Sequence, residues 1–267
     1  ELQESNHKLF DALHDIKDSI NYAERIQRAM LPADENIQRH LTDSFILFRP
    51  RDVVSGDFYW YNHKDGIDYI AAVDCTGHGV PGAFMSMVGS SLLNEIVLTK
   101  NTTNPSEILA QLNRGVQDAL KQRENQTRDG MDLALCAIDY KNKTLKYAGA
   151  NRALWIIRNS VNSIEVEEIK ATKCAIGGFT DESQHYETHS LEFKNGDTVY
   201  MSSDGYADQF GGERGKKLMT KRFKEILLTL QHKDMKQQGK TLDFEIIEWM
   251  GKIYEQVDDI LVIGVRF

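Results

Sequence analysis

Apolar side chains recur in a heptad pattern along residues 1–31, which we predict to form one long helix. It should end before Pro32, because proline disfavours helical geometry in the residue that precedes it. The apolar seam positions are Leu2, Leu9, Leu13, Ile16, Ile20, Ala23 and Met30. Asn6 and Gln27 lie in the same seam, where polar residues weaken a coiled coil and set its register. Two interpretations stay open: a coiled coil, or an amphipathic helix packed on its own domain.

Beyond this helix, short apolar runs predict strands, and longer runs at helical spacing predict helices. Strands are expected at 44–48, 58–61, 69–73, 133–140, 144–148, 153–158, 198–201 and 260–267. Helices are expected at 83–98, 105–122, 218–230 and 242–254. Residues 160–198 hold short strand-like pieces and polar loops, which we expect to form a flap. Because most strands follow one another through short connections, the predicted fold class is α+β, with sheets packed between helices.

The composition is that of a globular protein: 41% of the 267 residues are hydrophobic and 27% are charged. The net charge of −8 and the scattered basic residues argue against a general affinity for nucleic acid or anionic membranes. We recognise neither a signal peptide nor an apolar run of membrane-spanning length, so we expect no membrane insertion by this segment. The chain begins without Met, inside a predicted helix, which suggests the cytoplasmic output part of a longer sensor protein.

Three cysteines, Cys75, Cys136 and Cys174, cannot all pair and show no CxxC spacing. This favours free thiols in a reducing compartment and therefore a cytoplasmic location. Cys75 lies three residues before His78, so a cysteine nucleophile has to be weighed. That interpretation leaves the acidic residues described next unexplained.

The most informative stretch is residues 71–83, where an apolar strand ends at Asp74 and three glycines follow before an apolar helix. Glycine lets a ligand approach the backbone closely, and a carboxylate at a strand end suits a hard cation with oxygen ligands. Asp57, Asp204 and Asp258 also lie at the edges of apolar runs, where an unpaired charge is costly. Each acid alone reads as a turn or cap residue. Together they predict one site, in which cations keep the clustered carboxylates ionised.

In four segments the chain resembles the metal-dependent protein phosphatases of the PPM (type 2C) superfamily, and most closely the bacterial SpoIIE/RsbU-like branch. The segments, in the family's order, are SGDFYW (55–60), DCTGHG (74–79), SDG (203–205) and DDILV (258–262). The resemblance covers roughly residues 45–267. It implies a PPM-type β-sandwich of two antiparallel sheets flanked by α-helices, preceded here by the N-terminal coiled-coil-like helix.

The resemblance also implies two divalent ions, Mn²⁺ or Mg²⁺, that activate a water molecule for direct attack on phosphorus. By this resemblance Asp74 bridges the two ions. Asp57, Asp204 and Asp258 complete the metal shells, together with the carbonyl oxygen of Cys75. Asp258 is preferred to the acid that follows it, because the family pattern places the ligand first in that pair.

Other residues have more open roles. In PPM enzymes an arginine near the first acidic segment can hold the substrate phosphate, and Arg51 is the candidate here. His78 is open between a general acid for the leaving oxygen and a structural role in the glycine turn. The Asn-Arg pair at 151–152 is open between a turn and the cleft. For the third metal ion found in many PPM enzymes, neither Asp129 nor Asp132 aligns cleanly with the family's ligand.

We therefore expect a serine/threonine phosphoprotein phosphatase, with residues 1–31 as a linker or dimerisation helix and residues 32–267 as the phosphatase domain. The resemblance implies a small phosphorylated STAS-type anti-sigma-factor antagonist as substrate, in a partner-switching pathway. It also implies a homodimer whose helix transmits a signal from an upstream sensory domain. A catalytically silent dimeric binding module is the alternative from another class, and the four acids argue against it. A metal-dependent phosphatase of small molecules is a third reading.

Overall fold

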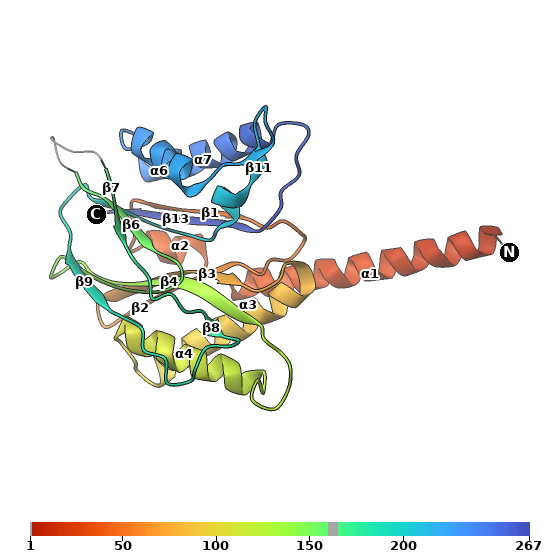
Figure 1. Cartoon of the computed structure of the whole chain (residues 1–267), viewed down its shortest axis with the longest axis horizontal. Coiled ribbons are helices and arrows are strands. Elements are labelled where there is room, and N and C mark those ends of the chain that lie inside the picture. The colour runs from red at the N-terminus through yellow and green to blue at the C-terminus, as the bar shows by residue number, and fades with distance from the viewer. Residues whose placement is uncertain (1, 160–164) are drawn as a thin grey trace.

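The computed structural model describes residues 2–159 and 165–267, in which two β-sheets face each other and helices cover their outer faces (Figure 1). Sheet A has the strand order β1 (Ser44–Arg49), β13 (Ile260–Arg266), β10 (Thr198–Ser202), β6 (Leu154–Ile157) and β7 (Val166–Ile169). Sheet B has the order β2 (Phe58–Lys64), β3 (Ile67–Cys75), β4 (Gly130–Asp139), β5 (Thr144–Ala150) and β9 (His189–Glu192), and β8 (Ile176–Gly177) pairs with β4. These strand pairs are antiparallel, which confirms the predicted α+β sandwich.

Helices form the two outer layers. Sheet B is covered by α3 (Gly79–Asn94), which a π-helical turn continues to Thr99, and by α4 (Pro105–Ala119). Sheet A is covered by α6 (Thr220–Thr229) and α7 (Met235–Met250). Short elements complete the fold: α2 (Asp34–Gln38), α5 (Gly205–Asp208) and the two-stranded sheet of β11 (Phe210–Gly211) and β12 (Lys216–Lys217).

The apolar core consists of three layers, and β3 contributes to two of them. Tyr69, Ala71 and Val73 pack with the residues of α3 and α4, whereas Ile70 and Ala72 pack between the two sheets. Because successive side chains of a strand point to opposite faces, a strand that is covered on both faces reads as one continuous apolar run. The third layer lies between sheet A and the helices α6 and α7.

The observed start of α7 differs from the prediction by seven residues. The helix begins at Met235, capped by the Asp234 side chain, which accepts the N–H of Gln237 at 2.7 Å. Apart from Met235, its first two turns are polar and contain Gly239, so they show no apolar spacing. A Cβ atom at Gly239 would lie 2.9 Å from Cγ of Phe45, so glycine permits the close approach of α7 to β1. The predicted start of α4 is confirmed, because Asn104 caps it.

Two further expectations need comment. The helical stretch Gly79–Thr99 is long and apolar enough, by composition alone, to cross a membrane, which corrects the expectation that the chain has no such run. Half of its most apolar window is buried, because α3 contacts both β3 and α4, and this packing accounts for its composition. In the predicted flap, β7, β8 and β9 are short strands, while residues 160–164 lie outside the described residues.

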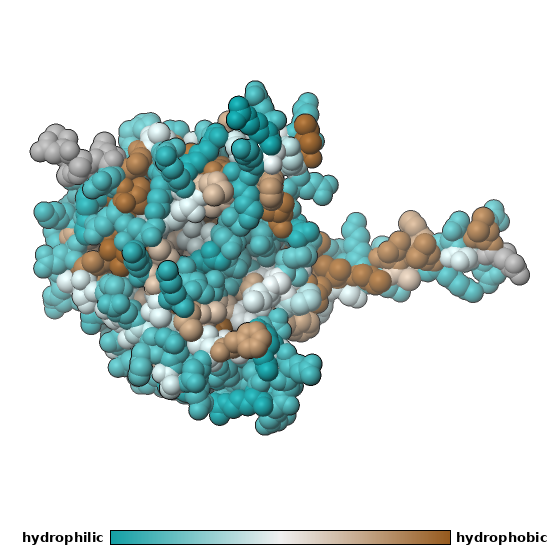
Figure 2. All heavy atoms as spheres, in the orientation of Figure 1, coloured by the Kyte–Doolittle hydropathy of each residue, from teal (hydrophilic) through white to brown (hydrophobic). Residues whose placement is uncertain are grey.

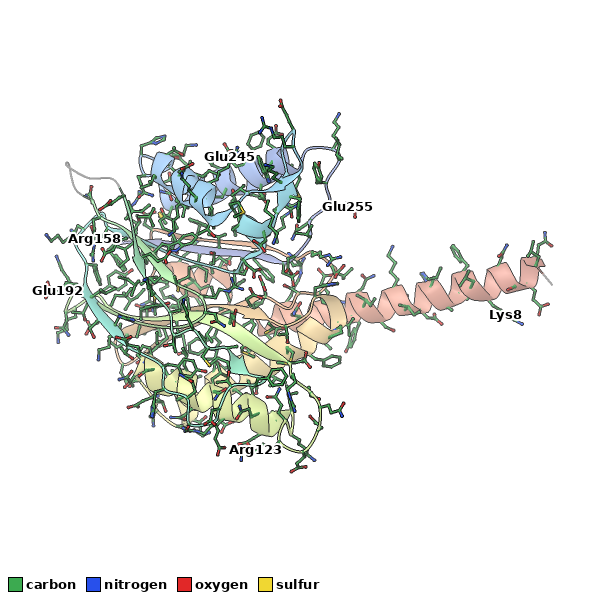
Figure 3. All side chains as sticks on the ribbon, in the orientation of Figure 1. Lys8, Arg123, Arg158, Glu192, Glu245 and Glu255 are labelled. Atoms are coloured by element: carbon green, nitrogen blue, oxygen red, sulfur yellow. The ribbon has the colours of Figure 1, made fainter. Side chains whose placement is uncertain are left out.

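The N-terminal helix α1 (Leu2–Met30) projects away from the sandwich along most of its length (Figure 1). Its seam residues Leu2, Leu9, Leu13 and Ile16 are more than half exposed. Figure 2 shows brown, hydrophobic patches along the projecting helix. Figure 3 shows Lys8 on the projecting part of α1, away from the sandwich. Its Nζ atom forms a 3.1 Å ion pair with Glu4, one turn earlier in the same helix. The structure therefore leaves the apolar seam of α1 uncovered within a single described chain.

Candidate metal centre

The acids Asp57, Asp74, Asp204 and Asp258 come from both sheets and meet at one edge of the sandwich. Asp57 directly precedes β2, and Asp74 is the penultimate residue of β3. Asp204 lies two residues after the end of β10, and Asp258 lies two residues before the start of β13. Their charges act on one another. Burial raises the pKa of Asp74 to about 7, and the negative charges of Asp204, Asp132 and Asp258 contribute to the rise. The structure thus brings together the four carboxylates that the sequence singled out.

The alternation of side chains explains why Asp74 faces this edge. Ile70 and Ala72 lie in the layer between the sheets, so Asp74, two residues further, takes the same side where that layer ends. Asp132 is its cross-strand partner in the antiparallel register of β3 and β4. It stands two residues before Ala134, which is again an inter-sheet residue. Two carboxylates are therefore placed side by side at the end of the apolar layer.

Asp57 is almost fully buried, with 3% of its surface exposed, and its Oδ2 atom has no hydrogen-bond partner among the described residues. Burial raises its pKa well above the usual range, the charge of Asp74 raises it further, and a hydrogen bond from Ser203 opposes the rise. A buried carboxylate oxygen without a partner is costly. A divalent cation with oxygen ligands would satisfy it, so this residue fits the role of a metal ligand.

Arg152 supplies a cation to the same cluster. Its Nη2 atom lies 2.7 Å from Oδ2 of Asp74, 2.7 Å from Oδ2 of Asp204 and 3.5 Å from Oδ2 of Asp132. Burial lowers the pKa of Arg152, but the charges of Asp74 and Asp204 outweigh this and raise it above its ordinary value. Arg152 therefore stays charged and partly offsets the repulsion among the acids.

The sequence left the pair at 151–152 open, and the structure places it at the acids. Asn151 has a φ of 58°, a left-handed conformation that asparagine tolerates, and its side chain donates to Oδ1 of Asp132 at 2.8 Å. The Tyr147 hydroxyl donates to the carbonyl of Arg152 and fixes the turn after β5. An Asn-Arg pair directly after a buried strand was the available signal, but spacing alone does not reveal which way such a turn points.

The adjacent acids Asp258 and Asp259 differ in their contacts. Asp259 is buried, and its two carboxylate oxygens accept the backbone N–H groups of Arg51 and Gly56, each at 2.7 Å. It thereby holds the loop that carries Asp57. Asp258 is exposed, and its Oδ1 accepts the N–H of Asp259 at 2.9 Å. Asp258 is therefore the more accessible of the two carboxylates for a metal ion.

Close backbone packing holds the two acidic loops together. A Cβ atom at Gly56 or at Gly82 would lie 2.3 Å from the carbonyl oxygen of Gly77 in both cases. No side chain fits at these distances, so the loop of Asp57 and the start of α3 both pack directly on the glycine turn. The carbonyl oxygen of Cys75 lies in the same place, 3.4 Å from the Cβ position of Gly56.

Cys75 itself does not fit a nucleophile. It is buried, and burial, followed by the charges of Asp57 and Asp74, raises the pKa of its thiol well above the usual range. Its thiol therefore stays protonated, whereas a nucleophilic cysteine needs a lowered pKa. His78 does not approach it as a base, because its Nδ1 atom instead pairs with Oδ2 of Asp52 at 2.8 Å, and both side chains are half exposed.

A pocket of about 580 Å³ opens beside the acids. Asp74, Asp132 and Arg152 line it together with Arg128 and Phe179. The Phe179 side chain is 88% exposed, and the Arg128 guanidinium lies 5.2 Å from the centre of its ring. Part of the predicted flap therefore stands next to the acid cluster.

Comparisons with known proteins agree with this geometry. The model of the family described as Stage II sporulation protein E (SpoIIE) matches residues 66–267. The solved SiaA-PP2C domain of Pseudomonas aeruginosa is similar, with 33% identity, a TM-score of 0.86, and 96% of this chain and 98% of that chain covered. No curated protein sequence matches the chain.

Two more distant structures share the fold. The phosphatase domain of SpoIIE from Bacillus subtilis, with a fragment of its regulatory domain, has 20% identity and a TM-score of 0.66, covering 84% of this chain and 62% of that one. The RsbU and RsbW domains of a Mycobacterium tuberculosis protein have 14% identity and a TM-score of 0.65, covering 84% and 59%. With the family match, the 33% identity and the converging acids, the chain belongs to the SpoIIE family of PPM-type, metal-dependent protein serine/threonine phosphatases.

Proposed function

We propose that Asp57, Asp74, Asp204 and Asp258, with the carbonyl oxygen of Cys75, hold two Mn²⁺ or Mg²⁺ ions that serve the hydrolysis of phosphoserine or phosphothreonine in a protein. The observation that supports this best is the buried Oδ2 of Asp57, which lies within a cluster of carboxylates and has no hydrogen-bond partner in the part of the chain that the structure describes. An all-oxygen donor set favours these hard ions. When bound, such ions lower the pKa of a coordinated water and neutralise phosphoryl oxygens.

The residues of the chain have distinct tasks in this proposal. Asp259 positions Asp57 by holding the backbone of its loop at Arg51 and Gly56. The same contact places the start of the Arg51 side chain beside the cluster, so Arg51 is our candidate for binding the substrate phosphate. Arg152 contributes a second positive charge, because it lines the pocket beside Asp74 and Asp132. An incoming phosphate dianion would thus meet cations as well as the ligand carboxylates.

The proposed substrate is a small phosphorylated STAS-type anti-sigma-factor antagonist in a partner-switching pathway. The family resemblance supports this, as does the shared fold with a chain that carries RsbU and RsbW domains together. The exposed Phe179 beside the pocket offers apolar surface to a protein surface rather than to a small phosphate ester. We further propose that the protein acts in the cytoplasm, as the output of an upstream sensory domain.

We also propose that residues 1–31 form a dimerisation and control helix and residues 32–267 the phosphatase domain. The uncovered seam of α1 supports pairing with a second copy, because isolated apolar faces of this length are normally buried. The contacts of Gln27 support a role of this helix in controlling the phosphatase. It is the buried residue of α1, and its amide accepts the N–H of Ser55 at 3.0 Å and donates to the Ser55 carbonyl at 2.6 Å.

The position of Ser55 makes this contact relevant to catalysis. Ser55 lies two residues before Asp57, and Gln27 also donates to the hydroxyl of Ser86 on α3 at 2.8 Å. A shift of α1 would therefore move backbone that leads directly to a proposed metal ligand. Gln27→Ala should lower the phosphatase rate severalfold, with weakened Mn²⁺ binding, whereas Arg28→Ala, one exposed residue further, should change neither.

Hydrolysis of p-nitrophenyl phosphate and of a phosphoserine STAS protein, with Mn²⁺ added or chelated, tests the proposed activity. We expect metal-dependent turnover of both in the wild type, a clear preference for the protein, and loss of turnover in Asp74→Asn. Equal turnover of small esters and the protein would favour a small-molecule phosphatase. Inactivity of the dimeric and monomeric forms with either metal would favour the silent binding module.

Dimerisation has its own test. Leu9→Lys with Leu13→Lys places two charges in the seam without touching the sandwich, and His14→Lys, on the outer face of α1, is the matched control. Light scattering should give a dimer for the wild type and the control, and a monomer for the seam variant. A monomeric wild type would contradict the proposed pairing.

A further inference from the structure

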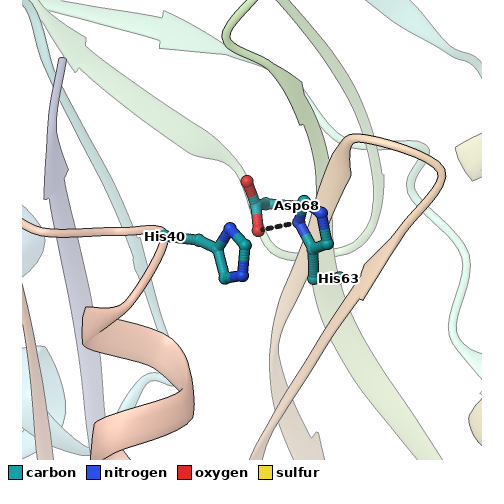
Figure 4. Close-up of side chains that lie close together, drawn as sticks. All are labelled: His40, His63 and Asp68. Atoms are coloured by element: carbon teal, nitrogen blue, oxygen red, sulfur yellow. Dashed lines mark hydrogen bonds and ion pairs between the residues drawn. The ribbon is translucent and has the colours of Figure 1, made fainter.

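A second cluster of metal-binding side chains lies at the other end of the β2–β3 hairpin from the acids. His40 stands in the connector after α2, His63 near the end of β2, and Asp68 near the start of β3 (Figure 4). His63 lies six positions beyond Asp57 along β2, which corresponds to roughly 20 Å at the rise of an extended strand. The cluster is therefore separate from the proposed phosphatase centre.

Asp68 is a fixed acceptor in this cluster. Its side chain is 3% exposed, and its Oδ1 atom lies 2.7 Å from the Tyr61 hydroxyl and 2.8 Å from Nδ1 of His63. Burial, together with this hydrogen bond and the charge of Asp68, raises the pKa of Tyr61, so the phenol keeps its proton and donates. A ligand carboxylate held by such a donor is typical of built metal sites, where outer partners orient the ligands.

The two imidazoles complete the set. The rings of His40 and His63 are stacked, with centroids 3.8 Å apart and an angle of 15° between their planes. One nitrogen of each ring and one carboxylate oxygen of Asp68 all lie within 4.8 Å of one another. Figure 4 shows the three side chains close together, with a dashed line for the hydrogen bond between Asp68 and His63.

We propose that His40, His63 and Asp68 bind one Zn²⁺ ion. Two imidazole nitrogens and one carboxylate suit zinc, which accepts nitrogen and oxygen at about 2.0–2.2 Å, better than Mg²⁺ or Mn²⁺. Binding would replace the 2.8 Å hydrogen bond between Nδ1 of His63 and Oδ1 of Asp68, because two ligands on one tetrahedral zinc ion lie about 3.3 Å apart. His40 belongs to the connector that follows α2, so a small movement of this ring brings its nitrogen within range.

The surroundings leave room for a fourth ligand. A hollow of about 330 Å³ lies between the end of α1, the connector and β2, and both histidines line it. Met30 and Pro32, at the end of α1, line the same hollow. A zinc ion would therefore join the connector to the hairpin close to the point where α1 leaves the domain, and water in the hollow would complete its coordination.

Titration calorimetry of the full untagged chain with ZnCl₂ tests the proposal, in buffer that contains millimolar Mg²⁺ and on an Asp74→Asn background to remove competition from the acid cluster. We expect one Zn²⁺ per chain with a micromolar or lower Kd. His40→Ala and His63→Ala should each weaken binding at least tenfold. His14→Ala is the matched control, because His14 is an exposed histidine with a carboxylate, Asp18, at 3.5 Å.

Two outcomes would overturn the zinc site: no stoichiometric binding to the Asp74→Asn protein, or binding that His40→Ala and His63→Ala leave unchanged. Cobalt substitution provides a second readout, because Co²⁺ bound by two imidazoles should give visible absorption bands that both variants lose. The melting temperature of each variant without metal shows whether it is folded. Zinc should raise the melting temperature of the wild type and of His14→Ala, and not that of His40→Ala.

Discussion

At one end of the β2–β3 hairpin, a buried Asp57 and a partly buried Asp74 lie among other carboxylates, and at the other end Asp68 is buried among donors. Asp57 keeps an oxygen without a partner, and burial with neighbouring charge raises the pKa of both acids. Asp68 instead accepts from Tyr61 and His63. The same two strands thus carry one cluster in which carboxylates repel one another and a second cluster in which the single carboxylate is already hydrogen-bonded. The difference indicates that repulsion among carboxylates lowers the stability of the fold at the acidic end, as is usual for functional sites.

The largest expected effect separates the two ends by activity. Asp74→Asn should reduce phosphatase turnover by about 10³-fold or more, because it removes the central ligand of the metal centre. His63→Ala, on the same hairpin, should leave turnover within about twofold of the wild type. Steady-state kinetics with saturating Mn²⁺ measures both. A comparable loss in the two variants would mean that the hairpin, rather than the acid cluster, carries the effect.

The pH dependence of the free energy of unfolding should reveal the cost of ionising Asp74 in the folded chain. Between about pH 4 and pH 7 the folded chain binds more protons at Asp74 than the unfolded chain does, because the folded pKa is about 7 and the ordinary value is 3.8. The free energy of unfolding of the chelated protein should therefore fall, by about 1–3 kcal/mol, as the pH rises through this range. Urea denaturation in EDTA at pH 5.5, 6.5 and 7.5 measures it. The slope should flatten in Asp74→Asn, and a rise in stability with pH would contradict the assignment.

Arg152 sharpens the comparison, because it contacts the same oxygen atoms that a divalent ion needs. Arg152→Gln should bind Mn²⁺ more tightly at pH 8, by roughly tenfold, since a competing positive charge is removed from Asp74 and Asp204. Calorimetry measures the affinity directly. Arg128→Gln is the control, because it removes the same charge from the same pocket without a contact to the acids. Weaker binding in Arg152→Gln would show that the arginine organises the ligands rather than competes for them.

The smallest expected effect is at the Asp68 end of the hairpin, where the carboxylate is hydrogen-bonded. Tyr61→Phe removes one of the donors to Asp68 but leaves His63, so it should cost about 1 kcal/mol of unfolding free energy. It should also weaken zinc binding severalfold, because the carboxylate loses its orienting partner. Denaturation with and without Zn²⁺ measures both. Tyr59→Phe, on the neighbouring position of β2, is the control, and equal losses in the two variants would remove the special role of Tyr61.

The sequence predicted more of the acid cluster than of its surroundings. Asp57 and Asp74 stand beside apolar runs, so the energetic cost of an unpaired carboxylate at these positions was evident from the sequence. The family pattern then assigned each acid to a position in the metal site. Arg152 was not assigned, because a left-handed turn at Asn151 decides its direction and spacing does not encode that turn. The early start of α7 was missed because, apart from Met235, its first two turns are polar and approach β1 through Gly239. The proximity of His40 and His63 depends on tertiary packing, which no local pattern contains.

Gln27 occupies a seam position of the heptad, and its side chain also forms the hydrogen bonds that hold α1 to Ser55 of the domain. The same side chain cannot pack in a helix–helix seam while it makes these hydrogen bonds. If two chains pair along α1, the paired stem has to stop before Gln27, which leaves residues 2–23 and a stem of about 30 Å at the rise of a helix. Past that point the two helices diverge into separate domains, and the assembly takes the shape of a Y. A change in the distance between the two phosphatase domains, which form the arms of the Y, would then shift the backbone that leads to Asp57.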